Sequence, residues 1–123
     1  MITILPADEA TVARLAAEEQ TTLLDQGVIL CDNGTELGHM LYAIRDNVLY
    51  IGDAVCEDYS LKHGLLRSVV NIGWNHEIEP VIYAGDAERD FLKRYGFSEK
   101  DGRLCTTVAE FFQPGCKSCK NKG

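Results

Sequence analysis

The sequence has few basic residues. Lysine and arginine total 12 against 19 aspartates and glutamates, which gives a formal net charge of −7 over 123 residues. Nucleic-acid binding depends on a basic surface that neutralises phosphates, so we expect no nucleic-acid partner. The same acidity disfavours anionic membranes. No apolar run approaches a membrane span, and Asp8 and Glu9 interrupt the N-terminus where a signal peptide would be apolar. We therefore expect a cytoplasmic protein without a membrane partner.

The sequence also has an odd number of cysteines, five, and only one C-x-x-C pair. An odd number of cysteines, three of them in or beside apolar segments, indicates reduced thiols rather than a disulfide framework. The single C-x-x-C supplies half of a tetrahedral zinc site and stands among lysines rather than at a helix start. We predict exposed thiols and no metal site, with metal or redox chemistry at this pair as an alternative. The five cysteines are Cys31, Cys56, Cys105, Cys116 and Cys119.

The composition is that of a globular domain. An apolar fraction of 46% and a charged fraction of 25% are close to the average for folded proteins. A chain of this length can bury one sizeable core. We expect one domain over residues 1–112 and a polar C-terminal tail with the C-x-x-C over residues 113–123.

Hydrophobic periodicity and turn signals predict an α/β domain with one central, mixed and mostly antiparallel sheet flanked by about three helices. The dipeptides Asn33-Gly34 and Asp101-Gly102 predict tight hairpins. Asp8 is expected to cap the first helix, and Gly27 to stop it. Strands are expected over 1–7, 28–44 as a hairpin, 48–56, 80–84 and 96–112 as a hairpin, and helices over 9–26, 60–76 and 87–95.

This element order resembles the GNAT N-acetyltransferase superfamily. The resemblance runs from Ile2 to about Phe112 and includes a three-strand meander, a central strand ending in "AVCED", a helix beginning near Gly64, and the corner "RYGF" at 94–97. It implies the GNAT fold and acyl-CoA-dependent acyl transfer, with acetyl-CoA as the expected co-substrate and an amine of a small molecule or peptide as the acceptor.

The family usually has two helices between its first two strands, and the loop between them shapes the acceptor pocket. Only about twenty residues, Ala7 to Gln26, fill that interval here. The resemblance therefore implies an acceptor site that is open or completed by another subunit in a homodimer.

The resemblance also implies where the cofactor lies. The thioester arm is expected in the splay between the fourth and fifth strands, and the pyrophosphate on bare N–H groups at the next helix start. The family pattern R/Q-x-x-G-x-G/A is half present: Gly64 matches its first glycine, but Leu66 and Leu61 replace its second glycine and its leading polar residue. An ordinary solvated helix start is an equal alternative. The expected cofactor-binding residues are Ala54, Val55, Cys56, Lys62, His63, Gly64, Leu65, Leu66 and Arg67.

The catalytic candidates are Asp53 and Tyr95. Asp53 is the one ionisable residue of an apolar central strand, so burial is expected to raise its pKa toward the range of a general base, with a structural carboxylate as the alternative. The family tyrosine that protonates the departing thiolate is replaced by Leu92. Tyr95, one turn later, is either core packing or a shifted acid. His39 is expected to be a satisfied core or edge histidine.

The replacement of family residues by Leu61, Leu66 and Leu92 favours a competing hypothesis. Three positions that are polar or glycine in the family are apolar here. A chain with these changes is also compatible with a GNAT-fold binding or regulatory module that carries out no acyl transfer.

Overall fold

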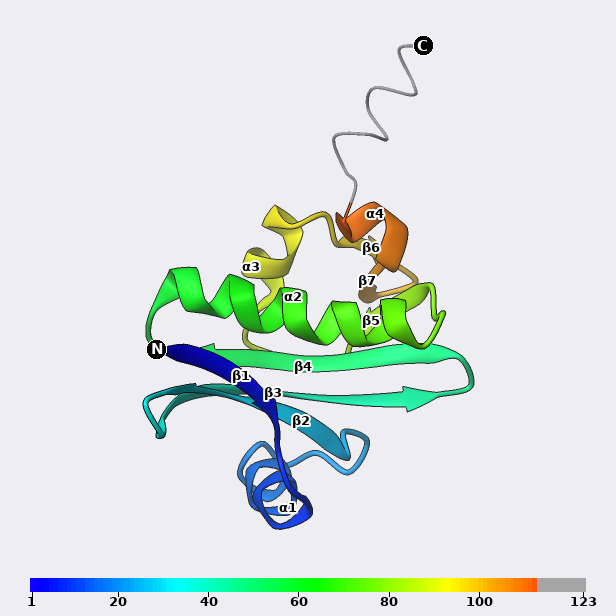
Figure 1. The fold of residues 1–123 in the computed structure, drawn as a ribbon. Helices are drawn as coiled ribbons and strands as arrows, with labels where there is room; N and C mark the ends of the chain where they lie inside the picture. The colour runs from blue at the N-terminus through cyan, green and yellow to red at the C-terminus, as the bar shows by residue number, and fades with distance from the viewer. Residues whose placement is uncertain (113–123) are drawn as a thin grey trace.

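A seven-stranded sheet organises residues 1–112, the part of the chain that the computed structural model describes (Figure 1). Its strand order is β1-β2-β3-β4-β5-β7-β6, and every neighbouring pair is antiparallel except the parallel pair β4 and β5. This confirms the expected mixed, mostly antiparallel sheet. The elements in chain order are β1 (Ile2–Pro6), α1 (Glu9–Glu18), β2 (Gln26–Asp32), β3 (Thr35–Arg45), β4 (Val48–Cys56), α2 (Tyr59–Asn75), β5 (Pro80–Tyr83), α3 (Arg89–Arg94), β6 (Ser98–Lys100), β7 (Arg103–Thr107) and α4 (Val108–Phe112).

Two-residue turns fix the register of the three hairpins. Both residues have positive φ at Asn33-Gly34 (51° and 88°), at Asp46-Asn47 (52° and 61°) and at Asp101-Gly102 (55° and 79°). Positive φ at both central positions is the mark of the turns whose twist suits a β-hairpin, and it explains the choice of Asn, Asp and Gly there. The two hairpins predicted from their dipeptides are confirmed.

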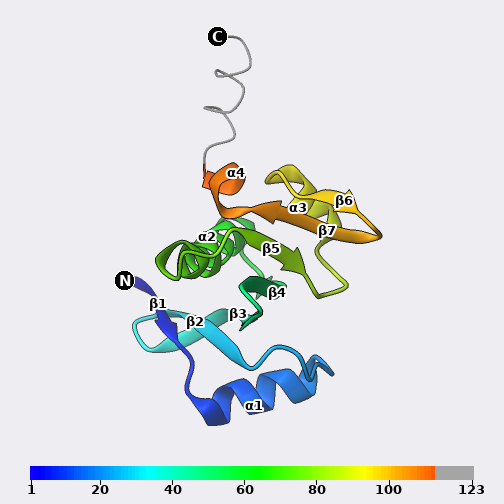
Figure 2. The same ribbon diagram turned by 90° about the vertical axis from the view of Figure 1, so that its right-hand side faces the viewer.

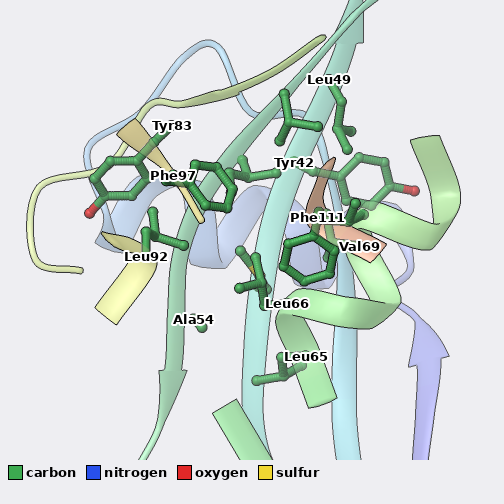
Figure 3. Close-up of a cluster of buried hydrophobic side chains, with 14 of the residues drawn as sticks. Tyr42, Leu49, Ala54, Leu65, Leu66, Val69, Tyr83, Leu92, Phe97 and Phe111 are labelled. Carbon is green, nitrogen blue, oxygen red and sulfur yellow. The ribbon is translucent and has the colours of Figure 1, made fainter. Parts of the chain in front are cut away.

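Helices α1 and α2 lie on opposite sides of the sheet, with β2 and β3 between them (Figures 1 and 2). The larger buried cluster packs α2 and the sheet together with side chains of α3 and α4, as Figure 3 shows in part. A smaller cluster lies beneath α1, formed by Val12, Leu15, Leu24, Leu41 and Ala43. Apolar residues at helical spacing on α2 supply the main core, as predicted. The fully buried ones are Leu65, Leu66, Val69 and Val70.

Helix α1 is shorter than predicted. It ends at Glu18, and Gln20 then takes a positive φ of 56°. Leu24 lies beyond the helix but is still buried beneath it, which explains why its spacing looked helical. Gly27 does not stop the helix. It lies in β2, where a Cβ would stand 2.8 Å from Cδ2 of Leu41.

The last predicted strand is also too long. Strand β7 ends at Thr107 and residues 108–112 form α4, so the described residues contain four helices rather than about three. The Thr107 hydroxyl accepts a hydrogen bond from the Glu110 amide at 3.1 Å, and the Glu79 carboxylate accepts one from the Ala109 amide at 3.2 Å. These bonds satisfy amides of the short helix, which strand periodicity cannot reveal.

Strands β4 and β5 part after three paired positions. Leu49, Tyr50 and Ile51 pair with residues 81–83, and the last bond between the strands joins the Ala84 amide to the Ile51 carbonyl at 2.7 Å. Strand β4 runs on to Cys56 beside β3 alone. At the point of parting, Gly52 and Asp53 form a β-bulge in which two residues of β4 stand opposite one residue of β3. A bulge at such a place redirects a side chain.

The burial of Leu66 predicts a large loss of stability on truncation. Leu66→Ala should lower the free energy of unfolding by about 2–5 kcal/mol, because it removes buried methyl groups and leaves a cavity. Denaturant unfolding of the variant measures this. Leu61→Ala, at a half-buried position of the same helix, is the control and should lose clearly less. A loss below about 1 kcal/mol at Leu66 would contradict its place in the core.

Candidate functional site

The bulge in β4 directs Asp53 into the opening between β4 and β5. Its carboxylate accepts hydrogen bonds from the hydroxyl of Tyr83 and from the Ala87 amide, the latter at 3.2 Å. The Tyr83 oxygen in turn accepts a hydrogen bond from the Glu88 amide at 2.8 Å. Asp53 therefore ties the unpaired part of β4 to the segment that follows β5.

Tyr83 is the residue that sequence reasoning missed. Its ring packs in the main core, while its hydroxyl points away from the cluster (Figure 3). Burial, and then the hydrogen bond to Asp53, raise the pKa of Tyr83 well above its ordinary value. The hydroxyl therefore stays protonated at neutral pH, and it donates its hydrogen bond to Asp53. Tyr83 and Asp53 lie thirty residues apart in the chain, and nothing in the apolar strand "PVIY" indicates their contact.

Two cavities meet at Asp53. The first, of about 300 Å³, lies between residues 19–24 and residues 52–53 and 84–86. The second, of about 520 Å³, lies between residues 36–39 of β3, residues 53–57, Lys62 and residues 87–88. Because Asp53 lines both, a ligand in either cavity can reach the same carboxylate.

A half-buried ion pair lines the second cavity. The ammonium of Lys62 on α2 lies 2.7 Å from each carboxylate oxygen of Glu88, just before α3. The two side chains are only 17% and 13% exposed. The ammonium also lies 4.9 Å from the centre of the Phe91 ring. The charge of Lys62 is therefore already neutralised within the protein.

His39, which also lines the second cavity, is paired with a carboxylate. Its Nε2 lies 2.7 Å from an oxygen of Glu19, which follows α1, and the histidine is 9% exposed. This is the satisfied histidine that the sequence predicted.

The expected cofactor residues fall into two groups. Ala54, Val55, Cys56 and Lys62 line the second cavity together with Asp53. Residues 63–67 do not line it. They lie inside α2, where each amide bonds the carbonyl four residues earlier, so their N–H groups are not bare. The helix predicted over 60–76 from its apolar spacing is confirmed, but the helix start near Gly64 that the resemblance implied is wrong.

The true start of α2 is Tyr59, because Asp58 caps the helix. The Asp58 carboxylate accepts hydrogen bonds from the Ser60 amide at 3.0 Å and from the Ser60 hydroxyl at 2.7 Å. Leu65 and Leu66 point into the core. Burial, and then Arg67, lower the pKa of His63, so its imidazole is neutral at pH 7.

Tyr95 lies away from Asp53. It caps the C-terminus of α3, and its ring stacks on His63 with the ring centres 4.2 Å apart. It lines neither of the two cavities. Leu92, in the position of the family tyrosine, is 1% exposed within the main core (Figure 3). The structure thus brings Asp53 together with Tyr83 rather than with Tyr95.

Comparison with solved structures identifies the fold. The chain resembles the GNAT family N-acetyltransferase YhbS from Escherichia coli, solved with CoA, at 12% identity and a TM-score of 0.63, over 91% of this chain and 84% of that one. A GNAT family acetyltransferase from Brucella melitensis, solved with acetyl-CoA, matches at 12% identity and a TM-score of 0.62, over 87% of this chain and 88% of that one. An acetyltransferase of the GNAT family from Staphylococcus aureus matches at 12% identity and a TM-score of 0.64, over 88% of this chain and 99% of that one.

These matches show that the chain has the GNAT fold. No sequence profile of a protein family matches it, and no curated protein sequence does. Within residues 1–112, no helix combines the length and apolar character needed to cross a membrane. The same residues contain no group of three or more His, Cys, Asp or Glu side chains able to hold a metal ion. Cys116 and Cys119 lie outside the described residues.

Gly85 offers a test of the Asp53–Tyr83 contact. A Cβ at Gly85 would stand 2.5 Å from Oδ1 of Asp53 and 2.8 Å from Cε1 of Tyr83. Gly85→Ala should therefore displace this contact and lower the free energy of unfolding by about 1–3 kcal/mol, as overpacking does. Denaturant unfolding measures the change.

Gly64→Ala is the matched control. A Cβ there meets only Cδ1 of Ile4, at 4.0 Å, within a helix interior. This variant should gain about 0.5–1 kcal/mol from lower backbone entropy in the unfolded chain. Equal responses at the two glycines would contradict the crowding at Gly85.

Proposed function

We propose that the protein transfers an acyl group, with acetyl-CoA as the expected co-substrate, to an amine. The observation that carries this proposal is the Asp53–Tyr83 pair, which lies where β4 and β5 part and where two cavities meet. A carboxylate next to a protonated hydroxyl is an arrangement that can both accept and donate protons.

The thioester arm fits beside the unpaired part of β4. Residues 54–56 pair with β3 on one edge, but β5 does not extend along their other edge. Free backbone N–H and C=O groups at a strand edge can pair with the amides of an extended ligand, as a further strand would. Pantetheine is such a ligand, and Ala54, Val55 and Cys56 are the residues proposed to hold it.

Asp53 and Tyr83 then divide the proton transfers. The amine nitrogen forms a bond to the thioester carbon as the carbon–sulfur bond breaks. Asp53 accepts the proton that the nitrogen loses, and Tyr83 donates its proton to the departing sulfur. The hydrogen bond between them returns the proton from Asp53 to Tyr83, so the pair ends as it began. Tyr83 thus replaces the acid that Leu92 cannot supply, in preference to Tyr95.

The acceptor is proposed to enter the first cavity. The lining includes the carboxylates of Glu19, Asp53 and Asp86. These attract the ammonium form of a small-molecule or peptide amine, which loses one proton to solvent before its neutral nitrogen attacks the thioester. A single helix, α1, fills the interval between β1 and β2, so a second copy of the chain in a homodimer is proposed to complete this site.

A second candidate function is a binding or regulatory module without acyl transfer. The burial of Leu66 and Leu92, together with the neutralised Lys62, favours it. Cofactor binding separates the two candidates.

Acetyl-CoA should raise the melting temperature of the full chain. A ligand that binds only the folded state adds about 2.7 kcal/mol of stability at a hundred times its Kd. Differential scanning fluorimetry over micromolar to millimolar acetyl-CoA measures the shift, with an equal concentration of sodium chloride as the ionic control. An unchanged melting temperature at millimolar acetyl-CoA would exclude the transferase proposal.

Asp53→Asn and Tyr83→Phe should each reduce turnover by about 10²–10⁴-fold, because each removes a proton-transfer group. Thiol release from acetyl-CoA, measured with a panel of primary amines, reports the rate. The affinity for CoA should change little in both variants, and Tyr95→Phe should retain turnover. A strong loss with Tyr95→Phe and none with Tyr83→Phe would assign the acid to Tyr95 instead.

A further inference from the structure

The ammonium of Lys62 is the group that an anionic ligand of the second cavity would bind, and the carboxylate of Glu88 already binds it. Of the described residues that line this cavity, Lys62 is the only lysine or arginine. Glu88 engages its ammonium through both carboxylate oxygens, each at 2.7 Å. An ammonium has three N–H donors, so this contact uses most of its capacity.

Other carboxylates make the release of Glu88 unfavourable. Glu36, Asp53 and Glu57 also line the cavity. If Lys62 turned to a phosphate, Glu88 would be left as a further negative charge on a side chain that is only 13% exposed. Leaving one partner of a buried ion pair uncompensated is strongly unfavourable. The ion pair therefore opposes the binding of phosphates to Lys62.

Glu88 is also connected to the catalytic pair. Its backbone amide donates to the Tyr83 hydroxyl at 2.8 Å, and that hydroxyl donates to Asp53. The contacts run without a break from Lys62 through Glu88 and Tyr83 to Asp53. The Glu88 side chain thus holds Lys62, while its backbone amide supports the hydroxyl of the proposed acid.

We propose that Glu88 sets the affinity of this protein for acyl-CoA, because its carboxylate holds Lys62 in the free protein and competes with the phosphates of the ligand for that ammonium. This inference rests on the proposed function. Phosphate binding at Lys62 releases the carboxylate of Glu88. Glu88 is a positioning residue, since it acts through Lys62.

Calorimetric titration of the full chain with CoA tests the proposal. Glu88→Gln keeps the shape of the side chain and removes its charge, so CoA should bind about tenfold more tightly, on the scale of one charge-assisted hydrogen bond. Lys62→Gln should weaken CoA binding by a similar factor. The gain in Glu88→Gln should shrink at high salt, because screening weakens the freed charge.

Glu57→Gln is the matched control. It removes a carboxylate from the same cavity, but Glu57 is exposed and is not the partner of Lys62. General charge relief should change CoA affinity by at most about twofold at moderate salt. An equal gain in Glu57→Gln and Glu88→Gln overturns the proposal, and so does unchanged affinity in Glu88→Gln.

Inorganic pyrophosphate separates this inference from the proposed function. If pyrophosphate binds Glu88→Gln more tightly than the wild type while CoA binds no variant, the competition for Lys62 stands and the transferase proposal fails. If CoA binds the wild type and Glu88→Gln equally, the competition for Lys62 fails and the transferase proposal stands. Thermal melting checks that each variant folds. Glu88→Ala, which also removes the carboxylate, should show the same gain and serves where Glu88→Gln does not fold.

Discussion

The hydrogen bond between Tyr83 and Asp53 is the contact on which the candidate site depends. It joins β4 and the end of β5 at the place where their backbone pairing has stopped. Without it, the bulge at Gly52 and Asp53 would direct a carboxylate into the opening with only the Ala87 amide as a partner. The absence of a side chain at Gly85 allows the two groups to approach. The Asp53–Tyr83 hydrogen bond therefore determines both the shape of the opening and the position of the carboxylate within it.

The fold was predictable where local signals act alone. The dipeptides Asn33-Gly34 and Asp101-Gly102 specify hairpins through their backbone conformations, and the apolar spacing of α2 specifies a helix that covers a sheet. The errors lie where tertiary contacts decide. Leu24 packs beneath α1 without belonging to it, and Glu79 satisfies an amide of α4 from thirty residues away.

The site was predictable only in part, for a related reason. Asp53 was identified because an ionisable residue in an apolar strand is unusual in itself. Tyr83 and Glu88 owe their roles to partners distant in sequence, and each alone looks like an ordinary strand or loop residue. Aligning a glycine pattern on Gly64 placed Leu66 at a phosphate. The helical spacing of Leu66 with Val69 and Val70 gave the better answer, since all three are fully buried.

The start of α2 differs from a phosphate-binding helix start, because the glycine pattern is incomplete and Asp58 caps the helix. In a phosphate-binding helix start, amides without partners face the anion. Here Asp58 already accepts from Ser60, and the hydrogen bonds from the Ser60 side chain and amide lower the pKa of Asp58, so that it stays ionised at neutral pH. Glu88 holds Lys62 in the same way. The Ser60 amide at the helix start and the Lys62 ammonium could each attract a phosphate near the opening. Each is already engaged by a carboxylate of the chain itself. In the proposed function, binding of an acyl-CoA therefore requires an internal anion to be exchanged for an external one, so we expect these internal contacts to limit the affinity.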